Sequence, residues 1–323
     1  MRKLTMNMSQ MTIRTHQKKQ MILIVIPEKI IMSIEKGKIV KGIGGFYYVK
    51  TETSVVECRA RGKFRNDSVL PYVGDNVQIS VNDDNTGYVV SIDERKNCFI
   101  RPPIANIDKL LIVASLVDPE PDTLFIDKML VCAEVNNVEV AICFSKSDLS
   151  DNEKKYTDIY TSTGYKVFLT SAINDSGMGK VYEFMKDCTL AVCGFSGVGK
   201  STLLNSLTGL SSFETGEISR KLNRGKHTTR HVELVEYEKD SYIADTPGFS
   251  MLELPADLES DMLIDYFPDL KKHSGDCKFS DCSHTSDKFC SVYDALIKGE
   301  ISESRYENYK YLYNEIQNRK NYR

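Results

Sequence analysis

Residues 189–201 read TLAVCGFSGVGKS, a short run of small and apolar residues followed by a glycine-rich loop. The run predicts a buried strand, and residues 202–207, TLLNSL, continue as an amphipathic helix. Between them, residues 194–201 match the pattern G-x-x-x-x-G-K-[ST] in the strand–loop–helix context that gives this pattern its meaning. A chance glycine-rich turn is the alternative, but it accounts for neither flank. The stretch predicts an α/β domain built around a phosphate-binding loop.

The residue types of the loop indicate what each contributes. Its glycines let backbone N–H groups curl around phosphate oxygens, the lysine reaches the β- and γ-phosphates, and the hydroxyl that follows it binds Mg²⁺. The predicted nucleotide-binding residues of this loop are Gly194, Phe195, Ser196, Gly197, Val198, Gly199, Lys200, Ser201 and Thr202.

Upstream of the loop, strand patterns alternate with helix patterns. Residues 107–117, 138–144 and 165–170 are predicted as strands, and residues 121–135 as a helix between the first two. Ser150-x-x-Glu153 is predicted to be a capping box that opens the next helix. This alternation is typical of a parallel sheet with crossover helices.

Two of these strands are followed by motifs that indicate guanine as the base. Residues 145–148, Ser-Lys-Ser-Asp, resemble the N/T-K-x-D motif, with serine at the position where Asn or Thr is usual. The Asp148 carboxylate can accept from both N1–H and N2–H₂ of guanine, a pair that adenine lacks, while the Lys146 stem covers the base. Residues 171–172 resemble the S-A motif, whose backbone supports guanine O6. The predicted base-binding residues are Ser145, Lys146, Ser147, Asp148, Ser171 and Ala172.

Downstream of the loop, residues 245–248 read Asp-Thr-Pro-Gly and fit the D-x-x-G element after a predicted β-hairpin. Asp245 is expected to hold Mg²⁺ through water, and the Gly248 N–H to contact the γ-phosphate. Residues 225–230, GKHTTR, form the expected first switch, and a plain basic loop is the alternative. Thr229 is preferred to Thr228 as a metal ligand because related GTPases place the ligand threonine next to the arginine. The predicted magnesium ligands are Ser201, Thr229 and Asp245.

A residue that orients the attacking water must also be found. Phe249 follows D-x-x-G where many GTPases have a glutamine, and it has no polar group for this task. His227 is the best-placed substitute, because an imidazole can hydrogen-bond water and titrates near neutrality. A surface histidine that contacts RNA is the alternative. The predicted catalytic residues are His227, Lys200 and Thr229.

The order of the motifs is unusual. The guanine motif comes first, then S-A, the phosphate loop, the switch threonine and D-x-x-G, whereas ordinary GTPases begin with the phosphate loop. Such a circular permutation still folds, because the termini of α/β domains usually lie close together. The permutation places the second switch beside whatever follows residue 248.

A cluster of cysteines and histidine follows: Cys277-x4-Cys282-x-His284-x5-Cys290. Three thiolates and an imidazole suit tetrahedral Zn²⁺, and a closed four-ligand shell is structural because it leaves no position for a catalytic water. His273 is an alternative to His284 as the fourth ligand, and a cluster that binds no metal is the other alternative.

The N-terminal part is basic and rich in strand patterns. The chain carries a formal charge of −3, yet Lys and Arg far outnumber Asp and Glu within residues 1–65, a distribution that attracts polyanions. Residues 38–98 hold about five short strand patterns, which predict a small barrel of the oligonucleotide-binding type. A β-module that only packs on its neighbour is the alternative. Residues 1–33 are expected to be a disordered extension or a misplaced start.

The composition indicates the cellular compartment of the protein. The longest apolar runs fall short of the roughly 18 residues of a membrane span, and the first apolar cluster is too short for a signal peptide. The nine cysteines form no regular disulfide framework, which favours a reducing cytosol. We therefore expect a cytoplasmic protein that has no membrane partner; a monomeric state is a separate expectation.

Taken together, these motifs resemble the RsgA family of circularly permuted GTPases of small-ribosomal-subunit assembly. The resemblance covers residues 34–320 and rests on the permuted order, GKIVKGIGGFYYV at residues 37–49, GKHTTR, DTPGF at residues 245–249 and the Cys/His cluster. It implies an oligonucleotide-binding barrel at 34–100, a GTPase domain at 101–254 and a zinc-binding helical domain at 255–323. It further implies that both appended domains grip rRNA and that the subunit stimulates hydrolysis of GTP to GDP.

Two other function classes remain to be weighed. A metabolic P-loop kinase or ATPase disagrees with the carboxylate of Asp148. An RNA-binding scaffold with a vestigial nucleotide site disagrees with the intact Lys200, Ser201, Thr229 and Asp245.

Overall fold

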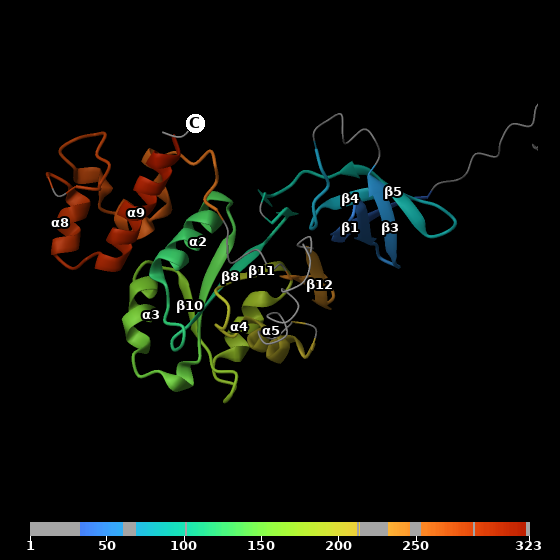
Figure 1. Ribbon diagram of the computed structural model, residues 1–323, viewed down its shortest axis with the longest axis horizontal. Coiled ribbons are helices and arrows are strands. Elements are labelled where there is room, and N and C mark those ends of the chain that lie inside the picture. The colour runs from blue at the N-terminus through green and yellow to red at the C-terminus, as the bar shows by residue number, and fades with distance from the viewer. Residues whose placement is uncertain are drawn as a thin grey trace, which may run out of the picture.

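The computed structural model describes residues 33–60, 69–100, 102–211, 213, 232–245, 253–286 and 288–320. It has three parts: a β-barrel, a central α/β unit and a helical C-terminal unit (Figure 1). The expectation for residues 1–33 lies outside the described ranges except at Ser33, which begins the first strand. This architecture confirms the expected fold class, an α/β domain flanked by an N-terminal β-barrel and a C-terminal helical unit.

The barrel is formed by five strands joined in the order β1-β2-β3-β5-β4, with β4 pairing back on β1. The closure depends on the long strand β1, whose first half pairs with β4 and whose second half pairs with β2. Alternate side chains such as Ile39, Val49 and Ile79 point inward and are fully buried. The strands are β1 (Ser33–Ile43), β2 (Phe46–Lys50), β3 (Val55–Ala60), β4 (Asn76–Val81) and β5 (Thr86–Ile92).

The central sheet has the strand order β10-β9-β8-β11-β13-β12, in which only β12 runs antiparallel to its neighbour. The short pair β6 (Cys98–Phe99) and β7 (Ile104–Ala105) connects the barrel to it. The strands of the sheet are β8 (Lys109–Ser115), β9 (Glu139–Ser145), β10 (Lys166–Leu169), β11 (Thr189–Cys193), β12 (Glu233–Glu238) and β13 (Ser241–Asp245).

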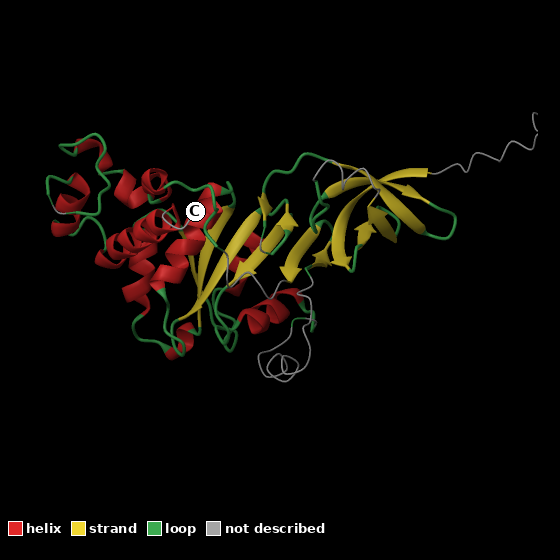
Figure 2. Ribbon diagram, turned by 45° about the horizontal axis from the view of Figure 1, so that its top comes forward, coloured by secondary structure: helices red, strands yellow, loops and turns green. Residues whose placement is uncertain are grey.

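Helices cover both faces of this sheet, as Figure 2 shows. Along β8, Leu110 and Ile112 face one core, which they share with α2 and α3, while Leu111 and Val113 face a second core with α4 and α5. Burial on both faces explains why the parallel strands read as continuous apolar runs. The helices are α2 (Thr123–Val135), α3 (Glu153–Thr161), α4 (Met178–Met185) and α5 (Lys200–Thr208).

The start of α3 differs from the expectation. The helix begins at Glu153 with Asn152 as its N-cap residue, and no side chain makes a capping hydrogen bond. The Ser150 hydroxyl accepts from the Asn152 N–H instead, 3.2 Å away. The predicted capping box is therefore wrong, because a short side-chain turn at Ser150 competes for the same hydroxyl.

The barrel docks on the antiparallel edge of the central sheet. Strand β1 pairs with β12 at Lys41 and Glu233, whose side chains also form an ion pair of 2.7 Å. Lys38 Nζ donates to Thr189 Oγ1 at 2.9 Å, and its burial lowers the pKa of this ammonium group. The barrel thus covers an edge that would otherwise expose unpaired backbone groups.

The C-terminal unit packs on α2 through its long last helix. Its elements are η3 (Ser260–Tyr266), α7 (Pro268–Lys271), η4 (Ser274–Asp276), α8 (Ser291–Ile297) and α9 (Glu303–Lys320), where η denotes a 3-10 helix. Of the helices in the part of the chain that the structure describes, none is both long and apolar enough to cross a membrane.

One buried charge joins this unit to the central domain. The guanidinium of Arg305, 1% exposed, donates to Asp127 of α2 at 2.7 Å and to both carboxylate oxygens of Asp269 at 3.0 and 2.6 Å. Asn308 Nδ2 donates to the second oxygen of Asp127 at 2.7 Å. Burial disfavours the charged guanidinium, but the two carboxylates outweigh it and raise the pKa of Arg305 further above its ordinary value.

We predict that Arg305→Met destabilises the protein by about 3–5 kcal/mol, because it leaves the Asp127 carboxylate buried without its cation. Lys310→Met is the matched control: it removes a cation from the same helix, but one that forms an exposed pair with Glu307, so it should cost about 0–1 kcal/mol. Urea unfolding followed by far-UV circular dichroism measures both. Equal midpoints for the two variants would contradict the prediction.

Candidate functional site

The predicted nucleotide motifs meet at one edge of the central sheet. The phosphate loop follows β11, the guanine motif spans the end of β9, S-A follows β10, and D-x-x-G begins at the last residue of β13. These four strands are parallel, so their carboxyl ends lie together. The crevice beyond such ends is where open α/β sheets bind ligands.

The phosphate loop has the backbone that its glycines predict. Gly194, Gly197 and Gly199 all have positive φ, of 146°, 87° and 88°. At Gly194 a Cβ atom would lie 2.2 Å from the carbonyl oxygen of Val113 in β8, so only glycine fits. Gly199 is the N-cap residue of α5, and no side chain makes a capping hydrogen bond there. The helix N-terminus therefore presents its N–H groups to the loop, as anion sites at helix N-termini do.

Lys200 is held inside the loop. Its ammonium group donates to the carbonyl oxygens of Gly194 at 2.7 Å and Phe195 at 2.8 Å. Burial lowers the pKa of Lys200 from its ordinary value. An anion that enters the loop would supply this cation with a counter-charge. Ser201 follows in the first turn of α5.

Ser145 links the guanine motif to the phosphate loop. The side chain is buried, and its hydroxyl donates to the Val198 carbonyl oxygen at 2.6 Å, with the Ala114 carbonyl at 3.3 Å. A serine at this position thus connects two loops that are 53 residues apart in sequence. The sequence indicated only that Ser145 departs from the usual residue type, not that it contacts the phosphate loop.

The remaining residues of the guanine motif, 146–148, follow Ser145, and the Lys146 side chain binds backbone carbonyl groups. Lys146 has a positive φ of 58°, and its ammonium group donates to the Val117 and Asp118 carbonyls at 3.2 and 2.6 Å. Asp148 lies in the short 3-10 helix η1 (Ser147–Leu149) and is exposed.

The S-A motif lies beside this loop. The Ser147 N–H donates to the Thr170 carbonyl, which places residues 171–172 next to the guanine motif. Ser171 is fully buried, whereas Ala172 is exposed.

The predicted switch residues fall largely outside the described ranges. Thr228, Thr229 and His227, as well as Gly248 and Phe249, are not described. Of D-x-x-G, the structure describes the backbone of Asp245, which pairs with Glu233 at the end of the β12–β13 hairpin.

A ring contact that the sequence did not indicate supports the phosphate loop. Phe195, 39% exposed, lies 4.5 Å between ring centroids from Phe125 in the first turn of α2. Phe125 was only one apolar residue in a predicted helix, and no local pattern distinguishes it. The contact attaches the tip of the loop to a helix that also contacts the C-terminal unit.

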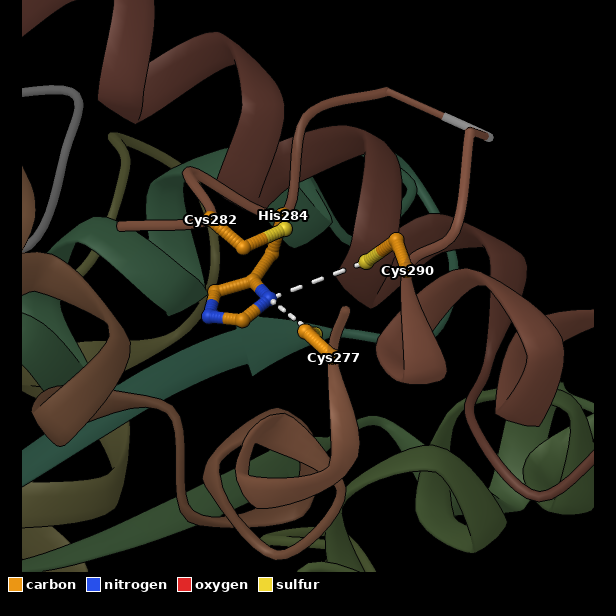
Figure 3. A group of neighbouring side chains, drawn as sticks. All are labelled: Cys277, Cys282, His284 and Cys290. Carbon is orange, nitrogen blue, oxygen red and sulfur yellow. Dashed lines mark hydrogen bonds between the residues drawn. The ribbon is translucent and has the colours of Figure 1, made fainter. Parts of the chain in front are cut away.

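The Cys/His cluster comes together in the C-terminal unit (Figure 3). The ligand atoms of Cys277, Cys282, His284 and Cys290 all lie within 4.8 Å of one another. The imidazole points its Nδ1 at two thiols, 3.4 Å from Cys277 Sγ and 3.6 Å from Cys290 Sγ. The alternative ligand, His273, instead has its Nδ1 3.6 Å from a carboxylate oxygen of Glu300.

The surroundings of the cluster act differently on the pKa values of its ligands. Burial acts to raise the pKa of Cys277, but hydrogen bonds from the Ser291 side chain and backbone lower it below the ordinary value. Burial also lowers the pKa of His284, which favours the neutral imidazole that a metal requires. Cys290, the N-cap residue of α8, is buried, and this burial raises the pKa of its thiol to about 12, so a bound metal must displace that proton. Three sulfurs and one nitrogen at this spacing fit a tetrahedral zinc site.

Fold and motif order together define a circularly permuted P-loop GTPase, flanked by a β-barrel and a helical unit with a Cys₃His cluster. The family model for the RsgA GTPase matches residues 92–255, and that for the RsgA N-terminal domain matches residues 36–89. The chain belongs to the RsgA GTPase family, whose members hydrolyse GTP.

Individual relatives agree with this assignment. The chain is 44% identical over 286 residues to a protein from Halalkalibacterium halodurans, covering 87% of this chain and 97% of the relative. It is 44% identical over 289 residues to one from Clostridium kluyveri, covering 89% and 100%. Both relatives are named small ribosomal subunit biogenesis GTPase RsgA.

Solved structures give the same result. The crystal structure of YjeQ from Thermotoga maritima matches with a TM-score of 0.74 at 33% identity, covering 88% of this chain and 99% of that one. YloQ, described as a circularly permuted GTPase, matches with a TM-score of 0.71 at 35% identity, covering 90% and 98%.

Ser145→Ala should weaken binding of GTP and GDP equally, by about 2- to 10-fold, because the buried Val198 carbonyl loses a hydrogen bond worth about 0.5–1.5 kcal/mol. The preference for guanine over adenine should not change, since Asp148 is untouched. Ser162→Ala, at the exposed end of α3, is the control. Calorimetric titration with each nucleotide measures the effect, and unchanged affinity would show that the link does not support the site.

Metal analysis of the purified, reduced protein should find about one zinc atom per chain. Cys290→Ser should remove it and lower the melting temperature of the C-terminal unit, because bound metal contributes folding free energy in small metal domains. Cys98→Ser is the matched control, since Cys98 is exposed and lies in the short β6 strand away from the cluster. A zinc-free wild-type protein would refute the metal assignment.

Proposed function

We propose that this GTPase binds the small ribosomal subunit and its rRNA and hydrolyses GTP to GDP and phosphate during late assembly of the subunit. The observation that carries the proposal is the joining of guanine motif and phosphate loop by Ser145 at one edge of the sheet. Two relatives that match along most of their length are named small ribosomal subunit biogenesis GTPases, and these names support the small ribosomal subunit as the partner.

Guanine selectivity is assigned to the loop after β9. Asp148 is exposed there, so its carboxylate is free to accept from N1–H and N2–H₂ of an entering base. The Ser147 and Thr170 backbone contact holds the S-A motif beside it, where the Ala172 N–H would meet O6. Adenine lacks this pair of donors, so an ATP-binding protein would gain no hydrogen bonds from the Asp148 carboxylate. The arrangement therefore favours GTP over ATP.

Phosphate binding and hydrolysis are assigned to the loop after β11 and to the switch residues. Lys200 exchanges its two carbonyl partners for phosphate oxygens when the nucleotide enters. Ser201, Thr229 and Asp245 would hold Mg²⁺, which neutralises phosphate charge when bound. His227 orients the attacking water, because Phe249 provides no polar group for it.

The Cys₃His cluster is assigned to structural zinc. Cys277, Cys282, His284 and Cys290 would occupy all four positions of a tetrahedral ion, which cross-links the segment between α7 and α8 when bound. The cluster therefore has a role in rigidity, not in chemistry on GTP.

RNA binding is assigned to both appended parts, and the excess of Lys and Arg over Asp and Glu within residues 1–65 supports this role for the N-terminal part. We propose that the functional boundaries follow residues 34–100 for the barrel, 101–254 for the GTPase domain and 255–323 for the zinc-binding domain. The protein is proposed to act as a monomer in the cytoplasm, where small subunits assemble.

The test is GTP hydrolysis by the full-length protein with and without purified small ribosomal subunits. We expect clear stimulation by the subunits and no competition by ATP. Lys200→Ala should abolish both rates, whereas His227→Ala should remove most of the stimulated rate and leave GTP affinity nearly unchanged, because the imidazole acts on water.

The outcomes separate the parts of the proposal. Binding without stimulation in the wild type would contradict the assigned enzymatic role on the subunit. A stimulated rate that persists in His227→Ala excludes this histidine from catalysis, and lost subunit affinity in that variant would indicate an RNA contact instead.

A further inference from the structure

Two exposed phenylalanines stand side by side on the Cys/His cluster. Phe279 is 52% exposed and Phe289 is 62% exposed, and their ring centroids lie 6.3 Å apart. Among the described residues, this is the one ring pair in which both rings are large exposed hydrophobics. Such an arrangement leaves apolar surface in water, which is unfavourable in the unbound protein and typical of a binding site.

The backbone of the cluster fixes both rings. Phe279 lies between two of the cysteines, and Phe289 directly precedes Cys290. The Lys278 N–H donates to the Phe289 carbonyl oxygen at 3.2 Å, which ties the two segments together. Phe289 has a positive φ of 59°, a conformation that non-glycine residues adopt only when their surroundings hold them. The exposure of the two rings is therefore a consequence of the folded loop, and it does not arise from an unfolded loop.

The two rings form a corner. Their planes meet at 75°, so a flat molecule stacked on one ring presents its edge to the other. The ammonium group of Lys278 lies 4.1 Å from the centroid of Phe289 and 5.7 Å from that of Phe279. Lys288, also exposed, precedes Phe289 in the chain. An exposed aromatic surface with the Lys278 ammonium group against it matches an unpaired nucleobase and the phosphate attached to it.

We propose that Phe279 and Phe289 form a stacking platform for one unpaired nucleobase of RNA, with Lys278 beside the neighbouring phosphate. The inference rests on the proposed function, since it specifies how the zinc-binding domain engages rRNA. A nucleobase is favoured over an apolar protein side chain because the cation lies against the rings. An apolar pocket filler would have to desolvate this ammonium group without neutralising it.

The experiment uses the full-length protein with three probes: a fluorescent single-stranded 12-mer of adenylate, an RNA duplex of equal length, and purified small subunits. Phe279→Ala combined with Phe289→Ala should weaken binding of the single strand by about tenfold, as expected for the loss of one stacked base. Binding of the duplex should change little. Lys278→Gln should lower the slope of log affinity against log salt by about 0.7, the value for one phosphate of a single strand.

Two controls keep the result interpretable. Ile297→Ala removes an exposed apolar side chain, 69% exposed, from the same unit and should leave all three affinities unchanged. Zinc content and intrinsic GTP hydrolysis should equal those of the wild type in every variant, which excludes misfolding of the cluster. Phe279→Leu combined with Phe289→Leu keeps the apolar character but removes the π-faces, and it should bind the single strand as weakly as the alanine pair.

Other results overturn the inference. If the leucine pair retains subunit affinity and neither pair affects the single strand, the rings fill an apolar pocket of a protein. Unchanged affinity of the alanine pair for both single strand and subunit removes any binding role. If the wild type itself does not bind subunits, the proposed function fails, while the single-strand comparison still decides the platform.

Discussion

Parallel strand pairing is the constraint on which the rest of this structure depends. Because β8, β9, β10, β11 and β13 run in one direction, every loop after them emerges at one edge of the sheet. The motifs then meet in space whatever their order along the chain. This explains how a phosphate loop that comes after the guanine loop in the sequence can still be joined to it by the single hydroxyl of Ser145. Circular permutation changes the connections and leaves the geometry of the edge intact.

Helix α2 is the common support of the nucleotide edge and the C-terminal unit. Its first turn places Phe125 against Phe195 of the phosphate loop, and Asp127 two residues later receives the buried guanidinium of Arg305. The contacts differ in kind: one is an apolar ring contact, partly open to water, and the other is a fully buried ion pair. The residue of α2 that contacts the phosphate loop and the residue that binds α9 therefore lie within one turn of the same helix.

The sequence predicted the parts of this protein that are encoded locally. Apolar runs and their spacing gave the parallel strands, and glycines at fixed offsets gave the phosphate loop, since one residue type alone tolerates positive φ at Gly194. The capping box at Ser150 failed because two local hydrogen bonds compete for one hydroxyl.

No local sequence pattern indicated the contacts between segments that are distant in the sequence. Arg305 and Asp127 are 178 residues apart, and Arg305 reads as one more charge on a polar helix. The partner of Ser145 was hidden for the same reason. The expected roles of His227 and Thr229 lie outside the described residues and stay predictions. The permuted order also has a consequence for synthesis. The barrel closes as soon as β5 is made, but β8 waits for its neighbour β11 some eighty residues later, with one of its edges unpaired although the helices that cover its faces have been made. The nascent chain therefore completes its sheet and its nucleotide pocket together, late in translation.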